Sequence, residues 1–89
     1  MPKKYPSDLT DRQWKVVSAL FEAARPKGGR PRQHSARELA NAIFYVMKEG
    51  CSWRALPDSF PPWKTVFSQR TRWTEDGTLQ RALSALARA

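Results

Sequence analysis

The side chains best suited to binding chemistry lie on one side of residues 63–73, a stretch that we predict to be helical. At the ~100° turn per residue of an α-helix, its apolar residues fall within one arc. We expect these apolar residues to face a core: Trp63, Val66, Phe67 and Trp73. The opposite side carries groups that can contact phosphates, guanine or other base edges: Lys64, Thr65, Ser68, Gln69 and Arg72. This division is typical of a helix that enters the major groove of DNA.

A proline-rich turn precedes this helix, and a shorter helical turn comes before it in the chain. Ser52 can cap the shorter turn, and Pro57 stops it. Pro62 suits the first position of the longer helix, because a missing N–H costs nothing there. Two helices joined in this way form a helix-turn-helix, a motif that places its second helix in a DNA groove. Arg54, in the shorter turn, is also predicted to contact DNA.

A second candidate site is the basic Gly/Pro-rich loop at residues 25–34, since residues 25–37 hold five basic side chains and no acidic one. Its Gly-Arg-Pro sequence resembles an AT-hook, a motif that lies in the minor groove of A/T-rich DNA. The negative potential of a narrow minor groove attracts arginine. We therefore predict DNA contacts from Lys27, Arg30 and Arg32. The alternative is a plain linker between two helices.

The overall charge also favours a polyanionic partner. The chain of 89 residues has a net charge of +8, from 16 basic and 8 acidic residues, a large surplus for one small domain. A basic surface that serves only solubility is the alternative. Cys51 and His34 are each the sole residue of their type, so we expect no disulfide, metal site or cofactor, and a cytoplasmic location. We expect no membrane contact or secretion leader, because no apolar run approaches the ~20 residues of a membrane span.

The spacing of apolar residues predicts an all-α fold, a small helical domain of four to five helices that contains the helix-turn-helix. This domain comprises residues 10–89, after an extended lead-in at residues 1–9. We find no internal repeat and no convincing strand, because the Val/Phe-rich piece near residue 66 has helical phase.

Capping residues indicate where the helices begin and end. Thr10 with Gln13 and Ser35 with Glu38 are capping boxes, in which each side chain bonds a free backbone N–H of the first turn. The helix after Ser35 carries one apolar face: Leu39, Ala42, Ile43, Val46 and Met47. Phe44 and Tyr45 widen that face, so we expect this helix to be the central element of the domain. Gly50 is placed to end it in a left-handed conformation.

Five segments also carry a resemblance, in order and at comparable spacing over nearly the whole chain: residues 5–14, 29–32, 50–57, 60–67 and 73–78. These segments are similar to the N-terminal domain of bacterial insertion-element transposases of the insertion-sequence-five type. In that family the domain precedes a DDE catalytic domain of ribonuclease-H-like fold, which cuts and joins DNA with two divalent metals. The resemblance implies that this chain binds double-stranded DNA, the terminal inverted repeats of the element, in the bacterial nucleoid, and positions the catalytic part.

The chain departs from the family pattern at Arg70, where members usually carry an aromatic or apolar residue. Arg70 falls in the middle of the predicted apolar arc, and burying an unpaired guanidinium is strongly unfavourable. We therefore expect its aliphatic stem to lie along the edge of the core while its charged group reaches water, a carboxylate or a phosphate.

Three functional interpretations remain open at this point. The first is a non-catalytic DNA-binding module, because the catalytic carboxylates of such transposases come from a separate domain. The second is a stand-alone truncated product that binds the ends of the element and inhibits transposition. The third is an interaction module that forms a homodimer through the last helix, which Thr78 can cap, by an apolar stripe that otherwise belongs to the core: Leu79, Leu83 and Leu86. Steep salt dependence of DNA affinity separates the first two from the third.

Overall fold

The computed structural model describes residues 7–23 and 34–88, and their fold is helical. It contains four α-helices and one 3-10 turn: α1 (Asp11–Ala23), α2 (Ala36–Glu49), η1 (Trp53–Ala55), α3 (Trp63–Glu75) and α4 (Thr78–Arg88). No strand occurs in this described part of the chain. The predicted all-α class is therefore confirmed.

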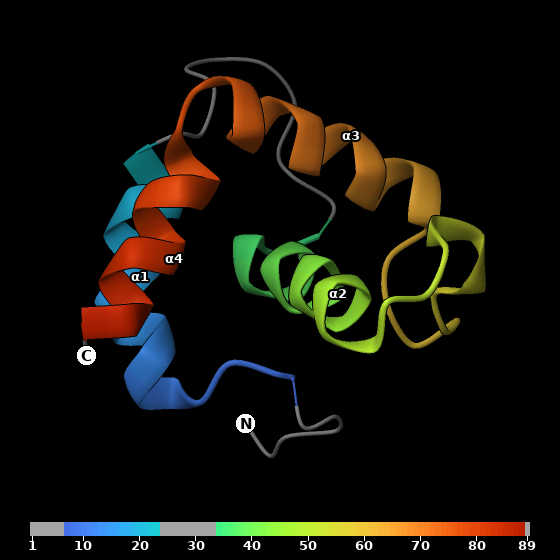
Figure 1. Cartoon of the computed structure of the whole chain (residues 1–89), viewed down its shortest axis with the longest axis horizontal. Helices are drawn as coiled ribbons and strands as arrows, with labels where there is room; N and C mark the ends of the chain where they lie inside the picture. Colours follow the sequence, from blue (N-terminus) through green and yellow to red (C-terminus); the bar gives the residue numbers. More distant parts are fainter. Residues whose placement is uncertain (1–6, 24–33, 89) are drawn as a thin grey trace.

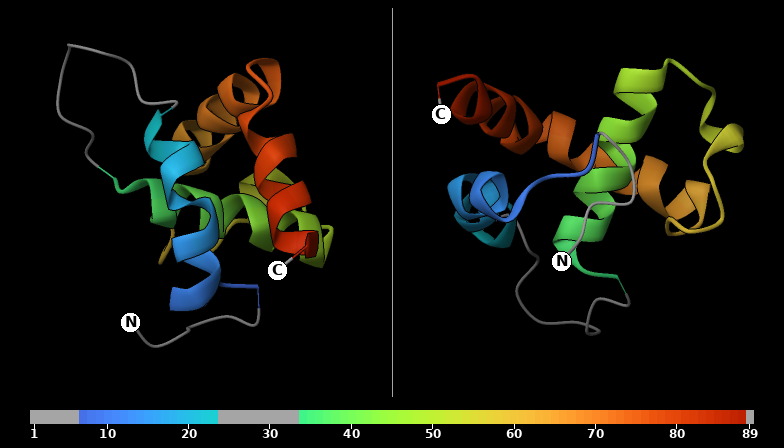
Figure 2. Two further views of the ribbon diagram at one scale, coloured as in Figure 1. Left: turned by 90° about the vertical axis from the view of Figure 1, so that its left-hand side faces the viewer. Right: turned by 90° about the horizontal axis from the view of Figure 1, so that it is seen from below.

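Each α-helix packs against two others, so that the four enclose one core (Figure 1). Helix α2 contacts α1 and α3, and α4 contacts the same two helices. Figure 2 shows α1 and α4 side by side, although their ribbons overlap in Figure 1. Helix α3 spans the top of the molecule in Figure 1, with η1 beside its first turns. This arrangement leaves the outer side of α3 open to solvent.

The core is built from large apolar side chains. The largest fully buried ones come from three helices: Val17, Phe21, Leu39, Ile43, Val66 and Trp73. The rings of Phe21 and Trp73 meet at 4.5 Å between centroids and tie α1 to α3. Helix α4 adds Leu79 and Ala82 to the core, whereas Leu83 of its apolar stripe is 39% exposed and Leu86 is half-buried.

The predicted starts of α1 and α2 and the predicted end of α2 are confirmed by their caps. Thr10 and Gln13 exchange two side chain–backbone hydrogen bonds, of 2.9 and 3.1 Å, at the start of α1. The Ser35 hydroxyl accepts from the Glu38 N–H at 3.1 Å. Gly50 ends α2 with a φ of 67°, in the left-handed region where glycine is favoured.

Two later boundaries differ from the prediction by one residue. Pro62 is the N-cap of α3 rather than its first helical residue, and its carbonyl accepts the first hydrogen bonds of the helix. Thr78 is the first residue of α4 rather than its cap, and its N–H donates to the Asp76 carboxylate at 2.9 Å. The Asp76 carboxylate can accept from Thr78 because the left-handed Gly77 turns the chain between these two residues.

The expected core-facing arcs of α2 and α3 were wrong at two positions. Phe67 is 42% exposed and Met47 is 53% exposed. In α3, Val66 and Trp73 are seven residues apart and define a narrow buried line. Phe67 lies about 100° around the helix from Val66 and therefore faces the side of η1 instead of the core. Cys51 is half-buried.

The helix-turn-helix is not confirmed as predicted, because its first element is not an α-helix. Trp53–Ala55 forms a single 3-10 turn, and the Ser52 hydroxyl makes no capping hydrogen bond to it. Residues 56–62 then lead to α3 without further helix. Among the described helices, none is both long enough and apolar enough to cross a bilayer.

Candidate nucleic-acid interface

Helix α3 buries a narrow stripe and leaves most of its circumference in solvent. Only Val66 and Trp73 are buried along its 13 residues. Four of the five α3 side chains predicted to contact DNA are exposed: Lys64, Thr65, Ser68 and Arg72. They lie within about 100° of one another around the helix axis, on the side away from Val66 and Trp73. We call these four residues the polar face of α3.

Gln69, the fifth predicted contact on α3, lies at the edge of this face. Its side chain is half-buried, because its position is only about 40° around the helix from Trp73. The structure therefore leaves part of the Gln69 side chain accessible beside the exposed Thr65.

The hydroxyl groups of α3 fall into two sets. Thr71 and Thr74 donate to backbone carbonyls one turn earlier, at 3.1 and 2.7 Å. The hydroxyls of Thr65 and Ser68 form no hydrogen bond with any residue of the described ranges 7–23 and 34–88. Only the second pair, which belongs to the polar face, has hydroxyl donors free for a ligand.

The cations on and beside α3 are also without acidic partners. Lys64, Arg72, Arg54 and Arg70 form no ion pair within the described part of the chain. The sequence from Ser59 to Thr74 contains no acidic residue. Within this range the positive charge is therefore not offset by an acidic residue, which favours binding of a polyanion.

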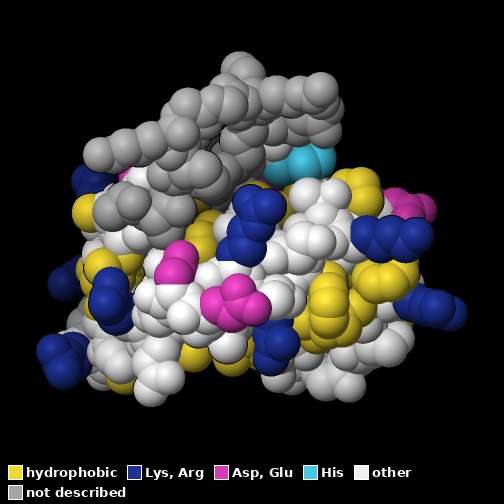
Figure 3. Space-filling model, turned by 90° about the horizontal axis from the view of Figure 1, so that it is seen from above, with side chains coloured by type: hydrophobic (Ala, Val, Ile, Leu, Met, Phe, Trp, Pro, Cys, Tyr) yellow, Lys and Arg dark blue, Asp and Glu magenta, His cyan; other side chains and the backbone are white. Residues whose placement is uncertain are grey.

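Arg54 joins this surface from η1 through a tryptophan of α3. Its guanidinium carbon lies 5.8 Å from the centre of the Trp63 ring, and the Lys64 ammonium lies 5.9 Å from the same ring. Such cation–π contacts hold a charged side chain in place without neutralising it. Figure 3, which looks down on α3, shows Lys and Arg side chains next to hydrophobic ones at its right-hand end, where η1 and the start of α3 lie.

Arg70 is exposed, as expected for a guanidinium that reaches out of an apolar arc. The narrow buried stripe explains why the departure from the family pattern is tolerated. The position of Arg70 lies beside Val66 on the helix surface but outside the line of fully buried side chains.

The basic loop cannot be placed on this surface, because Lys27, Arg30 and Arg32 lie outside the described residues. His34, the first described residue after the loop, is half-buried, and its Nδ1 lies 3.6 Å from the Glu38 carboxylate. The predicted minor-groove contacts therefore stay predictions.

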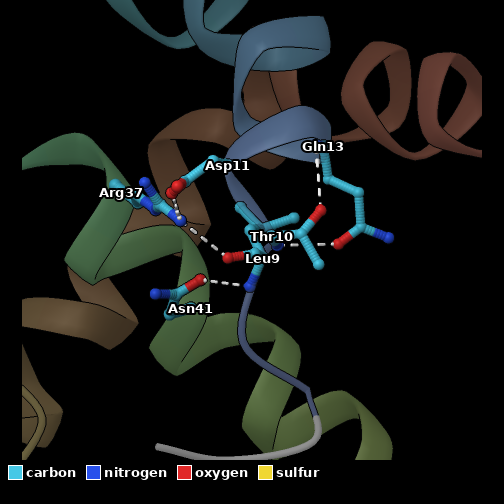
Figure 4. A network of polar contacts seen from close by, with 6 residues as sticks. All are labelled: Leu9, Thr10, Asp11, Gln13, Arg37 and Asn41. Carbon is cyan, nitrogen blue, oxygen red and sulfur yellow. Dashed lines mark hydrogen bonds and ion pairs between the residues drawn. The ribbon is translucent and has the colours of Figure 1, made fainter. Parts of the chain in front are cut away.

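One polar network was not found by sequence reasoning (Figure 4). The Arg37 guanidinium donates to the Leu9 carbonyl at 2.8 Å and pairs with the Asp11 carboxylate at 2.9 Å. The Asn41 side-chain oxygen accepts from the Leu9 N–H at 2.9 Å. Its only sign in the sequence is the helical spacing of Arg37 and Asn41 on α2. Their common partner, Leu9, lies about 30 residues earlier in the sequence.

This network has a structural role that removes Arg37 from the candidate interface. Its hydrogen bond to Asp11 lowers the pKa of that carboxyl below its ordinary value, so Asp11 is ionised at neutral pH. The charge of Arg37 is thus balanced within the fold, in contrast to the cations of α3.

The described residues bring together no group of three His, Cys, Asp or Glu side chains that could hold a metal ion. The assembled site consists of unpaired cations, free hydroxyls and half-exposed aromatic rings around the first turns of α3.

Comparison with known proteins shows the family of the chain. The family model described as "Putative transposase of IS4/5 family (DUF4096)" matches residues 9–83. A protein of Sinorhizobium fredii (strain NBRC 101917 / NGR234), described as "Uncharacterized protein y4sN", is 31% identical over 80 residues, which are 90% of this chain. The chain spans 63% of the length of that relative. No solved structure matches the chain. Since the family model covers most of its length, the chain belongs to the IS4/5 transposase family.

Proposed function

We propose that this chain binds double-stranded DNA as the end-recognition module of a bacterial insertion-element transposase. The observation that carries the proposal is the polar face of α3, whose cations have no acidic partner and whose hydroxyls have no hydrogen-bond partner in the described part of the chain. A helix exposed over most of its circumference can enter a groove without unfolding the core behind it. The terminal inverted repeats of the element are the DNA that the family membership favours.

In this proposal the side chains divide into two groups. Lys64, Arg72 and Arg54 bind phosphate or guanine, and so fix the position of the helix on the duplex. Thr65, Ser68 and the accessible part of Gln69 contact base edges in the major groove. The loop residues Lys27, Arg30 and Arg32 add contacts in an adjacent A/T-rich minor groove.

The proposal gives this chain no catalytic role. Cutting and joining of DNA with two metal ions requires carboxylates that converge on ions ~4 Å apart. We assign that chemistry to a separate DDE domain, and to this module the task of placing the DNA end.

A second candidate is a short product that occupies the ends of the element and inhibits transposition. The relative from Sinorhizobium fredii favours it, since 80 aligned residues make up 63% of that protein. It is therefore less than half as long again as this chain, which leaves no room for a further domain of the usual ~100–150 residues. Under this alternative, excess chain lowers the excision frequency of a full transposase, and the DNA-binding variants described next do not.

The proposed function is tested by changing Lys64 and Arg72 together to alanine. Both side chains are exposed, so the fold should be retained. We expect affinity for an inverted-repeat duplex to fall about tenfold or more, and the slope of log K against log salt to decrease by about two because two phosphate contacts are lost. Fluorescence anisotropy over a salt series measures both quantities.

The matched control changes two exposed arginines of α4, Arg81 and Arg88, which leave affinity within twofold if α3 is the binding element. Equal losses in both double variants would mean that only net charge matters and would reject the interface. Two further variants separate the roles within it. Gln69→Ala should change sequence preference rather than affinity for all DNA, and alanine at both Arg30 and Arg32 should weaken A/T-rich binding most.

A further inference from the structure

Phe67 is a large apolar side chain that the fold leaves in solvent. It is 42% exposed, although the sequence pattern predicts that it faces the core. It is not isolated, because the Trp53 ring meets it nearly edge-on, with centroids 5.6 Å apart and an interplanar angle of 84°. Trp63, one helical turn earlier on α3, is half-buried. We call these three residues the aromatic corner.

Cations surround the aromatic corner. Lys64 and Arg70 lie three residues before and after Phe67, which makes both its neighbours on the helix surface. Arg54 and Lys64 lie 5.8 and 5.9 Å from the Trp63 ring. None of these cations pairs with a carboxylate among the described residues. A ligand that covers the exposed face of Phe67 therefore meets positive charge on several sides.

We propose that the aromatic corner stacks on a nucleobase whose face has been exposed by unpairing, at a frayed or single-stranded end of the DNA that α3 binds. The inference rests on the proposed DNA-binding function. Aromatic rings within a basic surface form stacking sites for bases, which bring a flat apolar face and a phosphate together. A protein partner would need an apolar surface with carboxylates around it, whereas every nucleotide of DNA carries a flat base face together with a negatively charged phosphate.

Phe67 is the ring most able to receive the base. Trp63 already contacts two cations, and Trp53, which packs against Phe67, is half-buried, as Trp63 is, whereas Phe67 is exposed. In an intact duplex the face of each base is covered by its neighbours, so stacking requires an unpaired base or a base step opened by the inserted ring. An unpaired base and an opened base step can be distinguished by comparing duplex DNA with and without an unpaired tail.

The experiment compares three probes that share one sequence: a blunt inverted-repeat duplex, the same duplex with a short unpaired tail, and the tail strand alone. The tail carries a fluorescent adenine analogue whose emission is quenched by stacking. We expect the full chain to bind the tailed duplex about tenfold more tightly than the blunt one, and to change the emission of the analogue. In Phe67→Ala this preference ratio falls to about one, and the emission change is lost.

Two controls separate stacking from a general effect on the fold. Phe67→Trp keeps an aromatic ring and should restore the preference. Leu83→Ala truncates a residue of similar exposure, 39%, on another helix and should leave the preference ratio unchanged. Circular dichroism of each variant checks that the helices persist.

The remaining outcomes each overturn the inference. Tight binding of the blunt duplex with no preference for the tail rejects base stacking and leaves the proposed function intact. An emission change that appears equally with the analogue inside the blunt duplex assigns Phe67 to wedging between paired bases instead. Dissociation of a dimer by Phe67→Ala, measured by sedimentation velocity, makes the corner a protein interface. Failure of the wild-type chain to bind any of the probes rejects the proposed function itself.

Discussion

At the residue scale, Arg37 is the side chain that ties the start of the described chain to α2. Its guanidinium donates a hydrogen bond to the Leu9 carbonyl at 2.8 Å and forms an ion pair with the Asp11 carboxylate at 2.9 Å. The two partners differ in exposure: the Asp11 side chain is 66% exposed, whereas Leu9 is buried at 4%. The hydrogen bond to Leu9 is therefore the more important one for stability, because an unpaired polar group is costly mainly where water cannot reach it.

We expect Arg37→Met to lower the free energy of unfolding by about 1–3 kcal/mol, because the partly buried Leu9 carbonyl loses its donor. Methionine retains most of the aliphatic volume of the stem, so the loss reports on the polar contacts. Urea denaturation followed by circular dichroism measures the effect. Arg12→Met, at an exposed position of α1, is the control and should change stability by less than about 0.5 kcal/mol. Equal stability of the two variants would contradict the role given to Arg37.

At the element scale, α2 shows how local sequence ends a helix. Gly50 follows Glu49 with a φ of 67°, and its N–H donates to the Val46 carbonyl at 2.9 Å. No atom lies within 4 Å of the position that a Cβ would occupy there. A substitution at Gly50 therefore introduces backbone strain without a steric clash, and the cost of the left-handed conformation can be measured separately.

We expect Gly50→Ala to destabilise the domain by about 1 kcal/mol and Gly50→Asn by less, since asparagine tolerates the left-handed region better than alanine. Thermal unfolding of the two variants gives the comparison. Lys48→Ala, an exposed change in the last turn of α2, should have an effect within about 0.5 kcal/mol. A loss in Gly50→Asn that is as large as in Gly50→Ala would show that something other than backbone strain is responsible.

At the scale of the whole molecule, one aromatic contact joins two helices that are far apart in the sequence. Trp73 of α3 is fully buried against Phe21 of α1, which lies more than fifty residues earlier. The Trp73 indole N–H is buried and has no acceptor in the described part of the chain. The packing of the ring thus stabilises the core, while the unpaired indole N–H reduces this stabilisation by a smaller amount.

We expect Trp73→Ala to destabilise the domain by about 3–5 kcal/mol, a large part of the stability of so small a fold. Trp73→Phe should cost clearly less, because it keeps a ring against Phe21 and also removes the unpaired N–H. Urea denaturation of both variants tests this order. If phenylalanine proved as damaging as alanine, the indole N–H would have to be making a contact essential to the fold.

The local features of this protein were determined by the sequence alone. The capping residues Thr10 and Ser35, the left-handed Gly50 and the helical spacing of apolar residues predicted where α1 and α2 begin and where α2 ends, and the family resemblance was confirmed. These features depend on hydrogen bonds and side chains within about four residues of one another, which the order of the residues already brings together.

The tertiary structure alone decided which faces are buried and which distant groups meet. Helix α3 packs through the narrow line of Val66 and Trp73, so Phe67 turns outward and Gln69 is partly covered. The periodic spacing of apolar residues shows which side of a helix is apolar. It does not show how much of that side the neighbouring helices cover. The partnership of Arg37 with Leu9 arose in the same way, because residues 28 positions apart become neighbours only when α2 packs against the chain before α1.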